Sequence, residues 1–345
     1  MFQITENDIN IVLKDYHIDT KCSSYTELQR YDYEEDDPAS KNVRLIVKVE
    51  LRDGCSLVLR FKNEEDAPQD VIEAQSRFAA LLYGNGIETP KVYASNGNFT
   101  RAYSINGYNV VVTVEDFKDG EIKTVDPKTA EDTGKLLARM HSIAEANDCH
   151  VDCEVLFDPL APNDLFFYES FEKKKERLLG IDSDLYYSIV KKHEELISHI
   201  APFGKEKRYA VQGDISDCNL YRTEDGRMGV FDFNRCGDNS FFFDAVMQAV
   251  FESRLMDYPE ELDGHQEEII FKSFLEGYQQ IRSFTAEQKE AFPYLYALII
   301  AFWGIDMKWV DNKHTVTVDE ADDVSVRQWM KDILERESTM CEVPG

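Results

Sequence analysis

Alternation of apolar and polar residues is strongest in the first third of the chain, where it predicts β-strands. Asp53-Gly54 separates two of these runs as a tight turn. The predicted strands are residues 25–33, 42–51, 56–62, 91–94 and 108–114.

Helical periodicity occurs twice in the same part of the chain. A short amphipathic helix is predicted over about residues 6–15. A second helix is predicted to begin at Asp66 as N-cap, with Pro68 in its first turn. Its apolar stripe is Val71, Ala74, Phe78 and Leu82. Strands and helix together predict a small α+β lobe over residues 1–117.

From residue 119 the pattern becomes mostly helical. Asp126-Pro127 supplies a cap followed by a first-turn proline, which predicts the start of a helix. Further helices are predicted at about 163–178, 184–200, 266–282, 286–310 and 322–337. Only the segment 208–233 interrupts them with strands. The predicted fold class is therefore α+β, with a larger, mostly helical lobe over residues 118–345.

The charge of the chain limits its partners. It has 38 basic and 66 acidic residues, a formal net charge of −28. A surface this acidic repels nucleic acid and anionic membranes, so neither is expected as a partner, and it attracts cationic small molecules. Solubility alone is the alternative explanation of the charge.

Cysteine usage and the N-terminus favour a cytoplasmic location. The seven cysteines are odd in number and lack paired C-x-x-C spacing, as is typical of reduced thiols. The start MFQITENDIN has neither the basic residues nor the apolar core of a secretion signal. The longest apolar stretch, residues 296–305, is too short to cross a bilayer. The oligomeric state is not indicated.

One hairpin carries the densest set of candidate chemical groups. Asp214 and Asn219 stand five residues apart, and Asp232 ends an apolar run. Between them, Asp225-Gly226 is a strong signal for a two-residue turn. Such a turn places Asn219 opposite Asp232, with Cβ atoms roughly 5 Å apart. Oxygen ligands at that spacing suit one Mg²⁺ ion.

These motifs resemble the aminoglycoside phosphotransferase family, which also includes choline, homoserine and methylthioribose kinases. The resemblance rests on Gly213-Asp214 with Asn219, Phe231-Asp232-Phe233, Gly237-Asp238 and Phe243-Asp244-Ala245. Weaker matches at 59–61, 89–92 and 137–141 follow in the family's order. The resemblance implies a bilobal protein-kinase-like fold and a kinase that phosphorylates a hydroxyl group of a small molecule.

The resemblance also implies roles for the hairpin residues. Asp214 would be the catalytic base that orients the acceptor hydroxyl and takes its proton. Asn219 and Asp232 would hold Mg²⁺, and Asn234 would touch the outer shell of the metal. The phosphate donor would be a nucleotide, ATP, with GTP as the alternative.

The nucleotide site is expected on the strand lobe. By resemblance, Arg60 faces the α- and β-phosphates, and Lys62 on the same strand face is the alternative cation. Glu73 is the candidate acidic partner of Arg60. The backbone groups expected to receive the adenine are those of Val114, Glu115 and Asp116.

Three further residues are expected to support the catalytic loop or the core. The resemblance implies that Asp244 braces the loop by accepting backbone hydrogen bonds. Gln212 stands where the family usually has His and retains the ability to hydrogen-bond. His141 closes a helical stripe and is expected to be a buried histidine with satisfied nitrogens.

The loop after the first strand departs from the family pattern. Residues 32–37 contain five carboxylates where the family has small residues that let backbone N–H groups approach phosphates. Because these carboxylates repel ATP, a non-catalytic, pseudokinase-like ligand-binding module is the alternative function. A protein kinase is disfavoured, since Asp232 and Asp244 are only 12 residues apart and leave no activation segment.

An aromatic and acidic cluster late in the chain is the candidate acceptor site. It consists of Trp303, Asp306, Trp309 and Asp311. Such a cluster can hold a cationic acceptor through cation–π contacts, and apolar helix packing is the alternative role of the tryptophans. The sequence leaves amino sugars, choline-like amines, amino alcohols and sugars open as acceptors.

Overall fold

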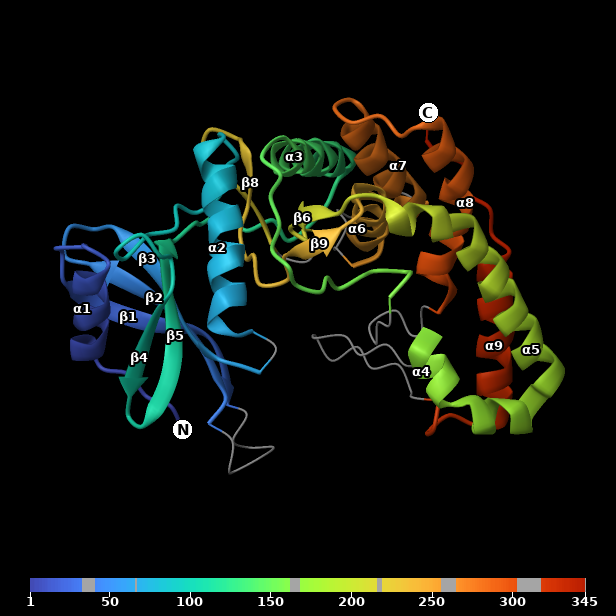
Figure 1. Ribbon diagram of the computed structural model, residues 1–345, viewed down its shortest axis with the longest axis horizontal. Helices are drawn as coiled ribbons and strands as arrows, with labels where there is room; N and C mark the ends of the chain where they lie inside the picture. Colours follow the sequence, from blue (N-terminus) through green and yellow to red (C-terminus); the bar gives the residue numbers. More distant parts are fainter. Residues whose placement is uncertain are drawn as a thin grey trace. The chain divides into compact units, whose positions relative to one another are not determined.

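The structure of the protein is a computed structural model (Figure 1). It describes residues 1–32, 41–65, 67–161, 168–215, 219–255, 265–302 and 318–344. The chain divides into two units. The first comprises Met1–Ile122, Ala146–Cys153 and Asn219–Gly237, and the second comprises Lys123–Glu145, Glu154–Cys218 and Asp238–Gly345. The sequence predicts one boundary between two lobes, at residue 117. In the structure, the hairpin segment Asn219–Gly237 groups with the first unit.

The first unit contains a five-stranded antiparallel sheet in the order β1-β2-β3-β5-β4. Its strands are β1 (Cys22–Asp32), β2 (Val43–Leu51), β3 (Ser56–Asn63), β4 (Arg101–Ile105) and β5 (Tyr108–Asp116). Four predicted strands are confirmed. The prediction for residues 91–94 is wrong, because this segment forms only one bridge, from Val92 to Glu115. Strand β4 was not predicted, since it lies at the sheet edge and buries only Ile105.

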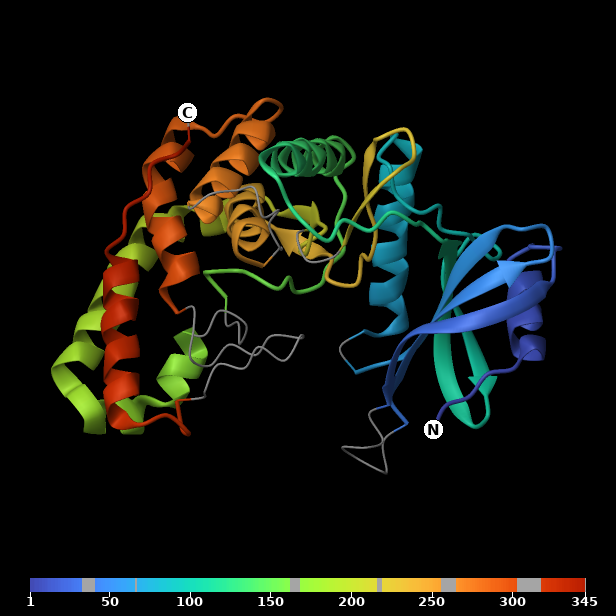
Figure 2. The ribbon, with the colours of Figure 1, turned by 180° about the vertical axis from the view of Figure 1, so that it is seen from behind.

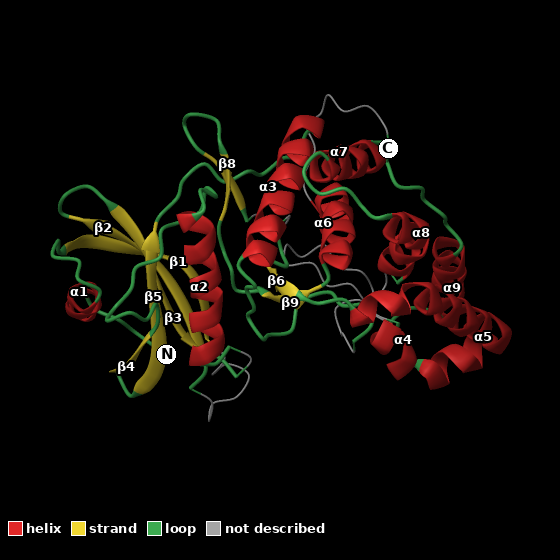
Figure 3. Ribbon diagram, turned by 45° about the horizontal axis from the view of Figure 1, so that its top comes forward, coloured by secondary structure: helices red, strands yellow, loops and turns green. Residues whose placement is uncertain are grey.

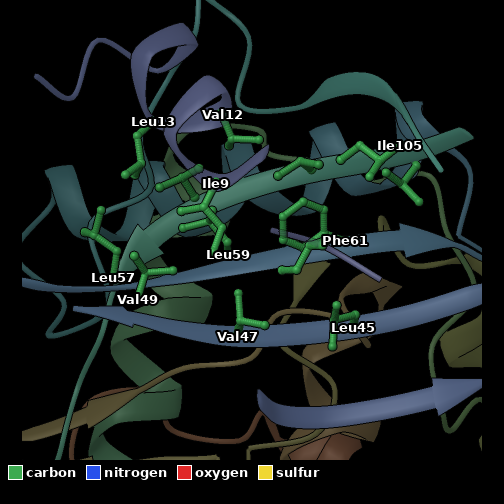
Figure 4. Close-up of a cluster of buried hydrophobic side chains, with 14 of the residues drawn as sticks. Ile9, Val12, Leu13, Leu45, Val47, Val49, Leu57, Leu59, Phe61 and Ile105 are labelled. Atoms are coloured by element: carbon green, nitrogen blue, oxygen red, sulfur yellow. The ribbon is translucent and has the colours of Figure 1, made fainter. Parts of the chain in front are cut away.

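Helix α1 (Glu6–Asp15), which the sequence predicted, covers one face of this sheet. Its start is a capping box, in which Asp8 N–H donates to Thr5 Oγ1 at 3.3 Å and Thr5 N–H donates to the Asp8 carboxylate at 2.8 Å. Figure 4 shows the core beneath it, formed by Ile9, Val12, Leu13, Leu45, Val47, Val49, Leu57, Leu59, Phe61 and Ile105. Because β3 buries Leu59 and Phe61 here, Arg60 and Lys62 lie on the opposite face.

Helix α2 (Gln69–Gly84) lies on the other side of the sheet from α1 (Figure 1). Its N-cap is Pro68, which forms no side-chain cap bond, and the expected cap Asp66 lies outside the described residues. The buried residues are Ile72, Gln75, Ser76, Phe78, Ala79 and Leu82. The buried face is thus rotated relative to the predicted stripe, and this rotation turns Gln75 inward.

The second unit is mostly helical, as predicted. Its helices are α3 (Pro127–Ala146), α4 (Tyr168–Lys173), α5 (Lys175–Ile200), α6 (Phe241–Leu255), α7 (Gln266–Gln279), α8 (Ala286–Ala301) and α9 (Asp323–Glu337), with a 3₁₀ turn η3 (Ala201–Lys205). Asp126 caps α3 through a 2.7 Å bond from Thr129 N–H. Helix α6 was not predicted, because its polar residues Asp244, Gln248 and Glu252 are buried like the apolar residues around them, so no exposed polar face marks it as a surface helix. The predicted helix 286–310 is confirmed as far as Ala301.

Close helix crossings hold this unit together. A Cβ atom on Gly134 of α3 would lie 2.0 Å from the Phe274 carbonyl oxygen of α7, so only glycine permits this contact. Figures 1 and 2 show α9 beside α5, and both contribute to a core that includes Phe171, Tyr186 and Met330. No helix among the described residues is long and apolar enough to span a membrane.

Two short strands, β6 (Tyr209–Val211) and β9 (Gly237–Asn239), form a separate pair near α6 (Figure 3). Strand β6 runs directly into Gln212-Gly213-Asp214. The position of the candidate base is therefore fixed by a strand end.

Candidate active site

The hairpin of the first unit pairs β7 (Leu220–Arg222) with β8 (Met228–Val230). The prediction of a two-residue turn is wrong. Thr223 N–H donates to the Arg227 carbonyl at 2.9 Å, and Gly226, with φ +84°, donates back to Thr223. The loop therefore has three residues and ends in a left-handed glycine.

This turn shifts the register by one residue. Phe231 N–H donates to the Asn219 carbonyl at 3.0 Å, so Asn219 faces Phe231 and not Asp232. Asp232 lies one residue beyond, with a left-handed φ of +56°. Its Oδ1 accepts a 3.2 Å bond from Asn234 N–H. Short-side-chain acids tolerate this backbone region because such a local bond compensates for it.

Arg60 forms ion pairs with two carboxylates. Its Nη2 lies 2.9 Å from Glu115 Oε1, and its Nη1 lies 3.3 Å from Asp232 Oδ2. Burial lowers the pKa of Arg60, but the charges of Asp232 and Glu115 outweigh it and raise the pKa above its usual value. Burial alone would raise the pKa of Asp232. The positive charges of Arg60 and Lys62 outweigh burial and hold the pKa of Asp232 below its usual range. Asp232 is therefore an ionised carboxylate.

Lys62 lies beside Arg60 on the same face of β3 and is 4% exposed. Its ammonium donates to Asn234 Oδ1. Burial, together with the charge of Arg60, lowers the pKa of Lys62 to about 8. The structure thus brings Arg60, Lys62 and Asp232 together, with Asn234 as a neutral neighbour.

The predicted pairing of Arg60 with Glu73 is wrong. Glu73 Oε2 instead accepts hydrogen bonds from the backbone N–H groups of Phe99 and Thr100, at 2.9 and 2.8 Å, and Glu73 Oε1 pairs with Arg77. Because α2 presents a different face, Glu73 caps a loop near the start of β4.

Gln75 is the residue of α2 that reaches the chain after Asp232, and the sequence did not indicate it. Its Nε2 donates to the carbonyls of Asn234 and Cys236, at 3.0 and 3.2 Å. Gln75 is buried on α2 together with Ser76, and this burial of polar residues is seen in the structure and not in the sequence.

The backbone groups expected to receive the adenine have partners in the structure. The Val114 carbonyl accepts from Tyr93 N–H at 2.8 Å, and Asp116 N–H donates to the Lys91 carbonyl at 3.0 Å. Glu115 pairs with Val58 in β3.

In the second unit, the candidate base Asp214 follows β6. Its N–H donates to Gln212 Oε1 at 2.8 Å, so Gln212 braces the loop through its side chain. The next residue, Ile215, donates its N–H to Gln248 Oε1 at 3.1 Å. Gln248 Nε2 in turn donates to Asp244 Oδ1 at 3.3 Å. Asp244 is therefore linked to the loop through Gln248.

His141 is a buried histidine with both ring nitrogens bonded, as expected. Its Nε2 lies 2.9 Å from Asp244 Oδ2, and its Nδ1 lies 2.9 Å from the Tyr278 hydroxyl. Burial lowers the pKa of His141, so the ring is neutral and donates to Asp244 while accepting from Tyr278. This triad fixes the Asp244 carboxylate.

Two predicted features lie outside the described residues. They are the cluster Trp303, Asp306, Trp309 and Asp311, and residues 33–37 of the acidic loop. Among the described residues, no group of three or more His, Cys, Asp or Glu is placed to hold a metal ion. A metal ion at Asp232 would therefore need ligands other than His, Cys, Asp and Glu, and Asn234 is the Asn residue that contacts Asp232.

Residues 39–284 match the APH family model, described as the phosphotransferase enzyme family. The match covers more than half of the chain, and the protein therefore belongs to this family. The expected class, a phosphotransferase with an alcohol group as acceptor, is confirmed. No protein of curated function gave a match to the sequence.

Solved structures share the fold over nearly the whole chain. A microcompartment-associated aminopropanol kinase covers 96% of both chains at 14% identity, with a TM-score of 0.60. The amicoumacin kinase hAmiN, in complex with AMP-PNP, Ca²⁺ and Ami, covers 95% of this chain and 94% of its own at 16% identity, with a TM-score of 0.58. An aminoglycoside phosphotransferase from Alicyclobacillus acidocaldarius covers 90% of both chains at 13% identity, with a TM-score of 0.50. The expected protein-kinase-like α+β fold is thereby confirmed.

Proposed function

We propose that the protein is an ATP- and Mg²⁺-dependent kinase that transfers the γ-phosphoryl group to a hydroxyl of a small molecule. One observation carries this proposal: an ionised carboxylate, Asp232, lies beside two cations, Arg60 and Lys62, on one face of the sheet. Cations that can pair with phosphate oxygens next to a carboxylate that can bind a metal are the parts that phosphoryl transfer requires.

The residues near Asp232 fit a magnesium ion. Asp232 and Asn234, which contacts it, supply hard oxygen donors as Mg²⁺ prefers, and Asn219, which lies opposite Phe231 in the hairpin, is proposed as a further ligand. Asp232 is charged without the metal, because its pKa is lowered. When bound, the ion neutralises charge on the donor phosphates. Arg60 competes with the metal for Asp232 Oδ2, so nucleotide phosphates are the natural alternative partner of its guanidinium.

Arg60 is proposed as the phosphate-binding cation, with Lys62 as the alternative. ATP is the proposed donor and GTP the alternative. The complex of the amicoumacin kinase with AMP-PNP and Ca²⁺ supports nucleotide use in this fold. We place the adenine near residues 114–116, the segment for which the sequence analysis expects it.

Asp214 is proposed as the base. The acceptor hydroxyl gives its proton to the Asp214 carboxylate while its oxygen forms a bond to the γ-phosphorus. The bond between the γ-phosphorus and the bridging oxygen breaks, and ADP leaves with that oxygen. The proton then passes from Asp214 to solvent.

The acceptor is proposed to be small and cationic, such as an aminoglycoside, choline or an amino alcohol. The net charge of −28 supports a cationic acceptor, since an acidic surface concentrates cations. The names of the aminopropanol and aminoglycoside kinases support the same class. A cytoplasmic location is proposed from the free thiols among the described residues.

A non-catalytic ligand-binding module is the second candidate. Its support is the run of five carboxylates in residues 32–37 of the sequence, which repel nucleotide phosphates. The two candidates are separated by measuring ADP release over a panel of amines, amino alcohols and amino sugars with Mg²⁺ and ATP. A kinase releases ADP in proportion to phosphorylated acceptor, whereas a binding module shows nucleotide binding without either product.

A further inference from the structure

Glu115 lies near the end of β5, on the face of the sheet that carries Arg60. The register of the two strands pairs Arg60 of β3 with Thr113 of β5. Val114 is part of the core beneath α1, and its neighbours in β5 therefore face the other side of the sheet, as Arg60 does. Glu115 is thus the diagonal neighbour of Arg60 on that face, at a separation that long side chains bridge.

Glu115 and Asp232 contact different edges of the Arg60 guanidinium. Glu115 Oε1 accepts a 2.9 Å bond from Nε and lies 2.9 Å from Nη2. Asp232 Oδ2 lies 3.3 Å from Nη1. Glu115 therefore makes the closer contact and uses two donors of the group, whereas Asp232 uses one. Because the guanidinium is planar and its donors are fixed, the edge that Glu115 holds sets the direction of Nη1.

The position of Glu115 is itself fixed by the sheet. Its backbone pairs with Val58 on one side and forms a bridge with Val92 on the other. Its side chain is 14% exposed. A carboxylate on a backbone that is bonded on both sides has little freedom to move, so the long Arg60 side chain adjusts to Glu115 and not the reverse.

The two carboxylates differ in what else they are needed for. Among the described residues, Glu115 and Asp232 are the acidic partners of Arg60, since Glu73 is engaged by Arg77 and by backbone N–H groups. Asp232 is proposed to bind the metal ion. Glu115 is then the carboxylate that remains with Arg60 when metal and nucleotide are bound.

We propose that Glu115 is the positioning residue of the phosphate-binding cation. It holds the Nε and Nη2 edge of Arg60 while the metal takes Asp232, and Nη1 is thereby directed at the donor phosphates. The acidic partner of the cation comes from strand β5 and not from helix α2. This proposal rests on the proposed kinase function, because it assigns a residue to the nucleotide site of that reaction.

The sign of the effect of Glu115→Ala on nucleotide affinity tests the proposal. The substitution removes a negative charge near the phosphates, and by charge alone it would strengthen the binding of the ATP anion. If Glu115 positions Arg60, the affinity of the full chain for Mg²⁺–ATP, measured by calorimetry, should instead fall about tenfold, the loss of one charge-assisted contact. The Mg²⁺ concentration needed for half-maximal ATP binding should rise, because the released guanidinium pairs more fully with Asp232.

Two further variants control this measurement. Glu27→Ala removes an equal charge from an ion pair with Arg30 on β1 of the same sheet, and it should leave the affinity unchanged. Glu115→Gln keeps an oxygen that accepts from Arg60 Nε, so it should lose less affinity than Glu115→Ala and should fold if the alanine variant does not. Unchanged or tighter binding of Mg²⁺–ATP by the Glu115 variants would overturn the proposal.

Action through Arg60 is tested in a double-mutant cycle. In an Arg60→Ala background, Glu115→Ala should cause no further loss of affinity, since the group that Glu115 positions is absent. A loss of about tenfold in both backgrounds would overturn the proposal, because Glu115 would then act independently of Arg60.

The outcome for the kinase function is read separately. A wild-type chain that binds no Mg²⁺–ATP would reject the kinase and the positioning role together. Phosphorylation of an acceptor by the wild type, with unchanged nucleotide affinity in Glu115→Ala, would retain the kinase and reject the role of Glu115. Loss of affinity in Glu115→Ala but not in the Arg60→Ala background, without phosphorylation of any acceptor, would retain the role of Glu115 and reject the kinase.

Discussion

The guanidinium of Arg60 lies 3.3 Å from the carboxylate of Asp232, although the two residues are 172 positions apart in the chain. This contact joins strand β3 to the end of the β7–β8 hairpin. A cation proposed to bind phosphate and a carboxylate proposed to bind metal are thus paired with each other. Nucleotide and metal must separate them, so the two ligands should bind cooperatively.

Asp232→Asn should abolish the effect of Mg²⁺ on nucleotide affinity while leaving the fold intact. The amide keeps the shape of the side chain but removes the charge that attracts the metal. Titration of ATP with and without Mg²⁺ measures the effect. Glu224→Gln, an exposed carboxylate in the same hairpin, is the matched control. A variant that keeps the Mg²⁺ dependence would remove Asp232 from the metal site.

Arg60 and Lys62 can be distinguished by substitution and by pH. Arg60→Ala should weaken nucleotide binding more than Lys62→Ala, since a charge-assisted contact is worth roughly 1.5–3 kcal/mol. Arg60 keeps its proton throughout the accessible range. Lys62 loses its proton as the pH rises through its lowered pKa of about 8. Nucleotide affinity should therefore be nearly constant from about pH 7.5 to about pH 9.5. A decrease centred near pH 8 would assign the phosphate contact to Lys62.

Gln75 is expected to position the chain after Asp232. Gln75→Leu removes both donors to the Asn234 and Cys236 carbonyls, and it should reduce stability by about 1–3 kcal/mol. It should also weaken Mg²⁺–nucleotide binding, while Gln75→Glu should not restore it because a carboxylate cannot donate to a carbonyl. The control is Gln69→Leu at an exposed position of the same helix. Loss of stability with unchanged nucleotide affinity would limit Gln75 to a structural role.

Glu337 should make stability depend on pH. Burial raises its pKa from 4.5 to about 9 in the folded protein. Between these values the unfolded chain releases the proton and the folded chain retains it, so stability falls as the pH rises, by at most about 1.4 kcal/mol per pH unit. Glu337→Gln should flatten this decrease in thermal melts, whereas Glu335→Gln, exposed on the same helix, should not. Parallel pH profiles for the wild type and Glu337→Gln would show that Glu337 is ionised when folded.

The sequence predicted most elements because strand alternation and helix caps are local signals. It failed where the outcome depended on packing. The edge strand β4 buries only Ile105, and α6 buries its polar as well as its apolar residues, so neither shows the usual division into a polar and an apolar face. The three-residue turn at Asp225-Gly226 differs from a two-residue turn by the backbone bonds of Thr223.

The residues of the candidate site also divide into those with a local sequence signal and those whose contacts depend on packing. Motif spacing predicts Asp214, Asn219 and Asp232 as site residues, and these roles stay predictions, whereas the strand alternation that puts Arg60 and Lys62 on one face is confirmed. The choice between Glu73 and Gln75 depended on a rotation of α2 that the apolar stripe did not specify. The links from Asp244 through Gln248 to Ile215 join segments distant in sequence, and such contacts have no local signature.

The most direct test of the central claim is the turnover of Asp214→Asn measured beside its affinity for Mg²⁺–ATP. Asparagine cannot accept the proton of the hydroxyl, so phosphorylation of any accepted substrate should fall by about three orders of magnitude or more, within the range of general-base effects. Affinity for Mg²⁺–ATP should stay within about twofold, since Asp214 is assigned no contact with nucleotide. Turnover within tenfold of the wild type would contradict the account, because Asp214 would then not be the base.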